Sequence, residues 1–304
     1  MRIEKILLAT DLSPRAVAAL PAVAGLAHQL SAEVELLYAH EQHKAPGSAA
    51  ERLEQRDIEA HFQALTAAAA AWDLQPRRKV LAGAPAMALQ AAAERDRHAL
   101  LTLVHDAGHR GSASIARSLA ARAVAPLLIV HAPMESKRRF LRPEAPQIRR
   151  IACAVDLAEG RTAVLEVAYA LAQSLGAKLT LIYALQTRGA EIVFEGNRPH
   201  LSPPTGSAIA EVQAAQMRLS ALAADLGDTH IGAHVVAASD VAAGIAAAAL
   251  DAEADLLVVA PRQLGRVARM VLGSVTDRLL QLSPLPIWVM GEALLGQMAA
   301  QGDG

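Results

Sequence analysis

ILLATDLSPRAVAALPAVAGLAHQLSAEVELLYAH, at residues 6–40, is matched without a gap by IACAVDLAEGRTAVLEVAYALAQSLGAKLTLIYAL at residues 151–185. In this alignment Asp11 pairs with Asp156, each at the end of a short apolar run. An internal repeat of this length specifies the architecture of both halves at once. The chain therefore consists of two copies of one domain.

The repeat continues to the end of each half, but its spacing changes. Residues 83–103 pair with residues 239–259 after a longer gap in the second half. The difference indicates an insertion around Arg188–Ser207 in the second half and a shortening before Ala113 in the first. Both changes are typical of loops, so the core is expected to be duplicated.

Apolar runs alternate with alanine-rich stretches of helical spacing, which predicts strand, loop and helix in turn. Alternating strands and helices indicate a parallel sheet covered on both faces. We predict α/β architecture with two tandem doubly wound domains, each a five-stranded parallel sheet flanked by helices. The expected strands are Lys5–Asp11, Glu33–His40, 78–82, 99–104 and 127–131, then Arg150–Asp156, Lys178–Leu185, 232–237, 255–260 and 286–290.

The domain limits follow from a stretch without apolar periodicity. Met134–Arg149 contains two prolines and several arginines and is predicted to be a linker. We expect domains at residues 1–135 and 148–292. In a doubly wound sheet a ligand binds beyond the strand carboxyl ends, near the reversal in strand order, where Asp11 and Asp156 are expected.

Composition excludes several classes of protein. The 304 residues include 53% hydrophobic, 19% charged and only 3% aromatic residues, with a formal net charge of −1. Nucleic-acid binding is therefore disfavoured. The single cysteine, Cys153, lies in an apolar run and is expected to be a buried core residue. No secretory or membrane-spanning segment is evident, so we expect a soluble, cytoplasmic protein that does not bind membranes.

Four stretches of the second half carry a resemblance to a known family: GAKLTLIY at 176–183, ADLLVV at 254–259, GSVTDRLL at 273–280 and SPLPIWV at 283–289. With the strand that ends in Asp156, this layout resembles the universal stress protein family. The resemblance extends over nearly the whole chain, twice, and is stronger in the second half. It implies an adenine-nucleotide alpha-hydrolase-like fold.

Members of that family that bind ATP carry Gly-x-x-Gly, nine residues, and then Gly-Ser or Gly-Thr. Gly273-Ser274 retains the last element, but Ala260 and Gln263 stand where the two earlier glycines are expected. Side chains at these places would crowd a phosphate chain. In the first half the Gly-Ser step has become Ala113-Ser114. The nucleotide motif is thus eroded in both halves.

The resemblance also implies site residues. Asp156 would contact the adenine or ribose, Ala184 would line the base pocket, and Gly273, Ser274 and Val275 would meet the phosphates. The first-half counterparts are Asp11, Ala39 and Ser114. In the alternative interpretation the aspartates accept hydrogen bonds from loop N–H groups and Ser274 is a helix N-cap. No cofactor is assigned with certainty, and ATP in the second domain is the cofactor that remains open.

Other clusters favour structural roles. His105, Asp106 and His109 have metal-ligating groups, but a chance cluster explains them better, so no metal is expected. The turn Gly108–Ser112 is short and more typical of a surface loop than of an anion site. The basic side chains in the linker are typical of a solvated segment: Lys137, Arg138, Arg139, Arg142, Arg149 and Arg150. For the arginines after Ala260, the sequence leaves open whether they face a ligand or water: Arg262, Arg266 and Arg269.

The favoured function is regulatory or protective binding in the stress response, because no set of catalytic residues is evident. The alternatives are an ATP-binding switch or weak ATPase in the second domain, a protein scaffold, and a small-molecule or lipid-binding module with Arg188–Ser207 as its lid. Adenine nucleotide and protein partners are expected. The family resemblance further implies pairing of the final strands, Leu127–Val130 with Ile287–Met290, inside one chain; a homodimer remains open.

Overall fold

The computed structural model describes most of the chain. The described residues are 2–13, 15–41, 49–105, 110–122, 125–131, 146–157, 162–188, 190, 192–195, 198–201, 203, 206, 208–227, 231–260 and 273–290. Contacts divide the chain into two compact units, one formed mainly by residues 2–119 and 124–147 and the other by residues 148–304. These units are called the first and second halves below.

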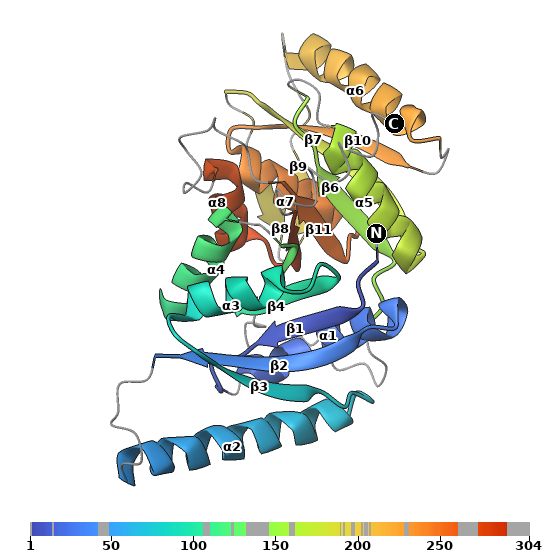
Figure 1. Cartoon of the computed structure of the whole chain (residues 1–304). Coiled ribbons are helices and arrows are strands. Elements are labelled where there is room, and N and C mark those ends of the chain that lie inside the picture. The colour runs from blue at the N-terminus through green and yellow to red at the C-terminus, as the bar shows by residue number, and fades with distance from the viewer. Residues whose placement is uncertain are drawn as a thin grey trace. The chain divides into compact units, whose positions relative to one another are not determined.

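The first half alternates strands and helices (Figure 1). Its elements are β1 (Lys5–Ala9), α1 (Arg15–Leu30), β2 (Glu33–His40), α2 (Ala49–Ala70), β3 (Arg77–Ala82), α3 (Pro85–Glu94), β4 (Ala99–His105), α4 (Arg110–Arg122) and β5 (Leu127–His131). The strands are parallel and lie in the order β3-β2-β1-β4-β5. The order reverses between β1 and β4.

The second half repeats this pattern and adds two strands (Figure 1). Its elements are β6 (Arg150–Ala154), α5 (Thr162–Leu175), β7 (Lys178–Gln186), β8 (Ile192–Glu195), β9 (Arg198–Leu201), α6 (Ala208–Asp225), β10 (Gly232–Ala238), α7 (Val241–Asp251), β11 (Leu256–Val259), α8 (Ser274–Leu282) and β12 (Ile287–Val289). Five strands are parallel, in the order β10-β7-β6-β11-β12. The prediction of a five-stranded, doubly wound sheet in each half is confirmed.

The first two strands of each half form the centre of a buried core. Ile6, Leu8, Leu36 and their neighbours are completely buried in the first half, as expected for parallel strands covered on both faces. Cys153 on β6 is equally buried, and desolvation raises the pKa of its thiol to about 12. The expectation that Cys153 is a core residue is confirmed.

The insertion at Arg188–Ser207 contains a β-hairpin. Strands β8 and β9 pair antiparallel, with Ile192 opposite Leu201, and the hairpin lies against α7. Helix α7 has an almost entirely apolar sequence, VAAGIAAAALD, and is buried along nearly its whole length. Its first-half counterpart α3 buries only Leu89 and Ala93. The hairpin therefore covers a helix that has no polar face to present to water.

Only the end of the predicted linker lies within the described residues. Pro146 and the residues up to Arg149 form neither helix nor strand. A Cβ atom placed on Gly25 of α1 would come within 1.9 Å of the Pro146 carbonyl oxygen. The backbone at Pro146 therefore packs directly on α1, at a point where only glycine leaves room.

Candidate functional site

A cavity of about 680 Å³ lies at the carboxyl ends of the strands in the second half. It is lined from β6, β7 and β11 and from the N-termini of α7 and α8, and β6 and β11 flank the point where the strand order reverses. All five residues predicted for this half line it: Asp156, Ala184, Gly273, Ser274 and Val275. Sequence positions far apart are thus brought to one cavity, here called the second-half cavity.

The loop after β6 places Asp156 at the cavity. The Val155 N–H group donates a hydrogen bond of 2.8 Å to the Ile182 carbonyl on β7, so the chain continues along the sheet before it turns. Arg218 of α6 then donates to the Leu157 carbonyl at 2.8 Å. These contacts hold both ends of a short segment whose middle residue is Asp156.

Helix α8 directs an open N-terminus at the cavity. Gly273 is its N-cap residue, and within the described part of the chain no side-chain hydrogen bond caps the helix. Ser274, Val275 and Thr276 all line the cavity. The first N–H groups of a helix have no partner within the helix and carry a partial positive charge, which suits an anion. Ser274 is the first helical residue, so the interpretation of Ser274 as the N-cap is wrong.

The N-terminus of α7 faces the same cavity but is already capped by a carboxylate. Asp240 Oδ1 accepts from the N–H groups of Ala242 and Ala243 at 3.0 and 3.1 Å, and Oδ2 accepts from Arg278 Nε at 3.0 Å. Partial burial raises the pKa of Asp240, but the Ala243 N–H, the Arg278 guanidinium and the Ala242 N–H together outweigh it and lower the pKa below its ordinary value. Sequence reasoning missed both Asp240 and Arg278.

The three first-half counterparts differ from these residues in local structure. Ser114 lies within α4, which begins at Arg110, so its N–H group is inside the helix rather than at an open end. Asp11 Oδ1 accepts from the Ser13 N–H group at 2.9 Å, and Ala39 is buried in β2. Neither described cavity is lined by any of the three. The alternative interpretation, a loop-stabilising aspartate, is confirmed for Asp11.

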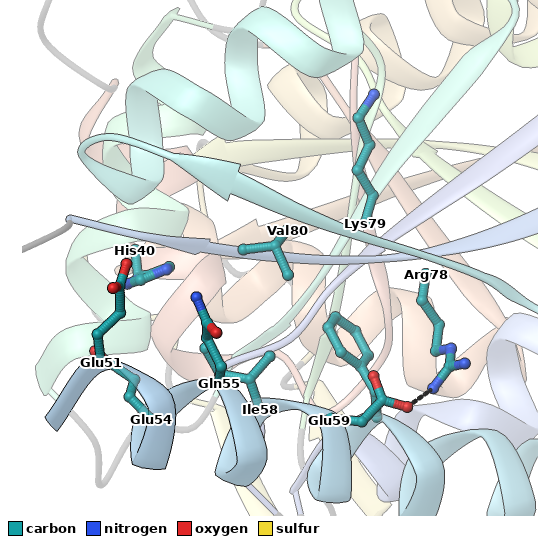
Figure 2. A pocket seen from close by; sticks show the side chains of 10 residues that line it. His40, Glu51, Glu54, Gln55, Ile58, Glu59, Arg78, Lys79 and Val80 are labelled. Carbon is teal, nitrogen blue, oxygen red and sulfur yellow. Dashed lines mark hydrogen bonds and ion pairs between the residues drawn. The ribbon is translucent and has the colours of Figure 1, made fainter. Parts of the chain in front are cut away.

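A different cavity, of about 450 Å³, lies in the first half between α2 and the outer strand β3 (Figure 2). We call it the α2–β3 hollow. Its lining combines acidic, basic and apolar residues: His40, Glu51, Glu54, Gln55, Ile58, Glu59, Phe62, Arg78, Lys79 and Val80. None of them was a candidate in the sequence analysis, because no motif marks them.

The remaining candidates are partly outside the described residues. His105 is buried, and its ring lies 5.3 Å from that of His131 in a T-shaped contact. Within the described ranges no three His, Cys, Asp or Glu side chains are grouped to hold a metal ion. The following predicted positions lie outside the described residues: Asp106, Gly108, His109, Lys137, Arg138, Arg139, Arg142, Arg262, Gln263, Arg266 and Arg269.

Both halves of the chain match one known protein family. The model of the universal stress protein family matches residues 2–131 and again residues 147–291. The chain belongs to the universal stress protein family and carries its domain twice, as the sequence resemblance predicted. A search of curated protein sequences gives no match.

Solved structures show the same tandem fold. A universal stress protein from Archaeoglobus fulgidus is 16% identical with a TM-score of 0.64, covering 96% of this chain and 98% of that one. A putative universal stress protein from Pseudomonas aeruginosa is 14% identical with a TM-score of 0.56, covering 99% and 98%. The cytoplasmic domain of a prokaryotic cation chloride cotransporter is 11% identical with a TM-score of 0.50, covering 98% and 100%. Proteins of different kinds thus share this fold, so the function must be argued from the site.

Among the described helices, none has the length and apolar character needed to cross a membrane.

Proposed function

We propose that this universal stress protein acts in the stress response as a regulatory binding protein, and that its second-half cavity holds an adenine nucleotide. The observation that carries the proposal is the uncapped N-terminus of α8 beside Asp156 and Ala184 in one cavity. Its volume, about 680 Å³, is within the usual range for small-molecule sites.

The cavity offers a separate environment for each part of such a ligand. Val155, Ala184 and Ile245 provide an apolar wall for the base. The Asp156 carboxylate suits a hydroxyl or amino group, since it accepts hydrogen bonds. The open N–H groups of α8 suit a phosphate. These assignments use the five residues that the family resemblance implied.

The number of phosphates is expected to matter. Two helix N-termini face the cavity, but Asp240 supplies its own negative charge at one of them. A long polyphosphate would bring further negative charge toward this carboxylate. We therefore expect AMP to bind at least as tightly as ATP in the absence of magnesium.

The test is calorimetric titration of nucleotide-stripped protein with adenosine, AMP and ATP. Ser274→Asp places a carboxylate at the N-terminus of α8, as Asp240 does at α7, and should weaken AMP binding tenfold or more while leaving adenosine nearly unaffected. Asp156→Ala should weaken all three ligands by roughly tenfold. Ser114→Asp, inside α4, is the matched control and should change the binding of none of the three ligands.

The binding results separate the proposal from its rivals. No heat with any of the three ligands at millimolar concentration would leave the protein scaffold as the better function. Release of phosphate from ATP that depends on Asp156 would instead favour the ATP-binding switch or weak ATPase. The pairing of the final strands of the two halves, and any homodimer, remain predictions that belong to this proposal.

A further inference from the structure

The outer edge of the second-half sheet is closed by a side chain. Gln216 of α6 donates from Nε2 to the Ala233 carbonyl at 2.9 Å, and its Oε1 accepts from the Val235 N–H group at 3.1 Å. These are the donor and acceptor that a neighbouring strand would supply to β10. Gln216 therefore takes the place of one residue of a further strand.

The register identifies the same edge in the first half. Tyr183 of β7 is opposite Val235, and its repeat partner Tyr38 of β2 is opposite Val80. In the same way, Ala233 is opposite Leu181 of β7, and Arg78 is opposite Leu36 of β2, the repeat partner of Leu181. Arg78 and Val80 of β3 are thus the equivalents of the two residues that Gln216 contacts.

The backbone of these residues points away from the sheet. Gly83 donates its N–H group to the His40 carbonyl at 3.0 Å, so alternate residues of β3 direct their backbone groups toward β2. Arg78 and Val80 lie between these residues, so their backbone N–H and carbonyl groups point outward. Among the described strands none lies beyond β3 in the strand order, and the α2–β3 hollow lies next to it (Figure 2).

The hollow has an apolar middle. Val80 projects toward α2 and is 48% exposed, and Ile58 lies on the facing side of the helix (Figure 2). Phe62 also lines the hollow. Glu59 and Arg78 form an ion pair of 2.8 Å across one part of the hollow. Lys79 points to the opposite face of the strand (Figure 2).

The other end of the hollow is acidic. Glu51 and Glu54 lie one turn apart on α2, near His40 at the end of β2 (Figure 2). Helical spacing places them on the same side of α2 as Ile58 and Phe62, where helix-on-sheet packing would normally require apolar residues. Closer packing of α2 on β3 would bring these carboxylates into the interface between helix and sheet.

We propose that β3 and the hollow bind an extended segment of a partner protein, which adds to the sheet as a sixth strand. Its backbone would pair with Arg78 and Val80, as Gln216 does with β10. On the side that faces α2, the segment would carry an apolar residue against Val80 and a lysine or arginine toward Glu51 and Glu54. Strand addition of this kind obtains affinity from the backbone and specificity from alternate side chains.

The charges of β3 itself argue against a second copy of this chain as the occupant. Arg77, Arg78 and Lys79 are consecutive, so pairing β3 with another β3 would bring like charges together across the two strands. A segment with a single lysine or arginine, directed at Glu51 and Glu54, avoids the repulsion between two such basic runs. The site is separate from the second-half cavity, and either proposal can fail alone.

The test uses the full chain and a blocked hexapeptide, acetyl-Thr-Val-Thr-Lys-Thr-Val-amide, as the probe. Amide hydrogen exchange in β3 should slow roughly threefold or more with about 1 mM peptide, while exchange in β10 stays unchanged. The same peptide with glutamate in place of lysine, and one with N-methylated amides, should protect β3 much less. Gln55→Trp, which fills the hollow, should abolish protection, whereas Arg56→Trp beside it should not.

A second variant tests the role of the backbone. Val80→Pro removes the outward N–H group at an edge position, where proline is tolerated, and should reduce affinity tenfold or more. Gln216→Ala should open the edge of β10 and speed its exchange. Unchanged β3 exchange with the lysine peptide, or equal protection by the N-methylated peptide, would overturn the proposal.

Discussion

Asp240 joins two helices at the second-half cavity through a single carboxylate. One oxygen caps α7 and the other accepts from Arg278 of α8. The pair is more than a third exposed, so solvent screens the ion pair, and the cap is the larger contribution to stability. The residue therefore combines a structural role in α7 with a negative charge that any ligand must meet.

We expect Asp240→Ala to lower the free energy of unfolding by about 1 kcal/mol, because α7 loses its N-cap. Asp240→Asn keeps a capping oxygen and should cost only a few tenths of a kcal/mol. Urea denaturation of both variants measures the difference. Equal stability of the alanine variant and the natural protein would contradict the capping role.

The cost of Asp240→Ala should also depend on pH. The pKa of Asp240 is lower in the folded chain than its ordinary value, so its stabilisation is fully present above that ordinary value and is lost as pH falls through the lowered pKa. The difference between the natural protein and Asp240→Ala should therefore shrink in acid. A difference that grows toward low pH would reverse the sign of this linkage.

Single residues also show what sequence alone can predict. Asp156 was found because ligands bind beyond the carboxyl ends of parallel strands, whereas Ser274 was found from the Gly-Ser step of the family motif. Asp240 had a local signal, an aspartate directly before an apolar helix, that was not used. Gln216 and the residues of the α2–β3 hollow had none, since their contacts depend on how a helix lies against a distant strand.

Among the elements, α7 and the hairpin β8–β9 depend on each other. The buried residues of α7 are nearly all alanine, and the hairpin packs on them. The sequence predicted the helix and located the insertion, but it left open whether the insertion is a lid or disordered. Short strands within a segment rich in proline and glycine give too weak a pattern to predict.

We predict that replacing residues 192–201 by a glycine-serine linker lowers the free energy of unfolding by about 2 kcal/mol or more. Each methyl-sized group that returns to water costs about 0.8 kcal/mol, and several alanines of α7 are affected. Thermal unfolding followed by circular dichroism, together with binding of a hydrophobic dye, measures the effect. Unchanged stability without dye binding would show that the hairpin does not cover α7.

The start of α4 is the element boundary that sequence reasoning located least well. Gly108–Ser112 was interpreted as a turn, but α4 already begins at Arg110. The earlier start places Ser114 inside the helix, whereas Ser274 begins α8. Ser114 therefore lies about one helical turn inside α4 and supplies no N–H group at the N-terminus of that helix.

At the scale of the whole molecule, each half ends in a short apolar strand, β5 or β12, with one neighbour inside its own half. We predict that these strands pair with each other within one chain, because unpaired apolar edges promote association. Analytical ultracentrifugation should then show a monomer of 31.8 kDa at all concentrations from about 1 to 100 μM. A dimer that forms as concentration rises would show pairing between chains.

Gln216 has one more consequence, for the growth of fibrils. Fibrils lengthen when each added strand leaves a fresh backbone edge for the next. Gln216 already occupies the Ala233 carbonyl and the Val235 N–H group, which a strand added to β10 would need. A strand that joins the second half at β10 must therefore first displace this amide side chain, which opposes the lengthening of a fibril at this edge.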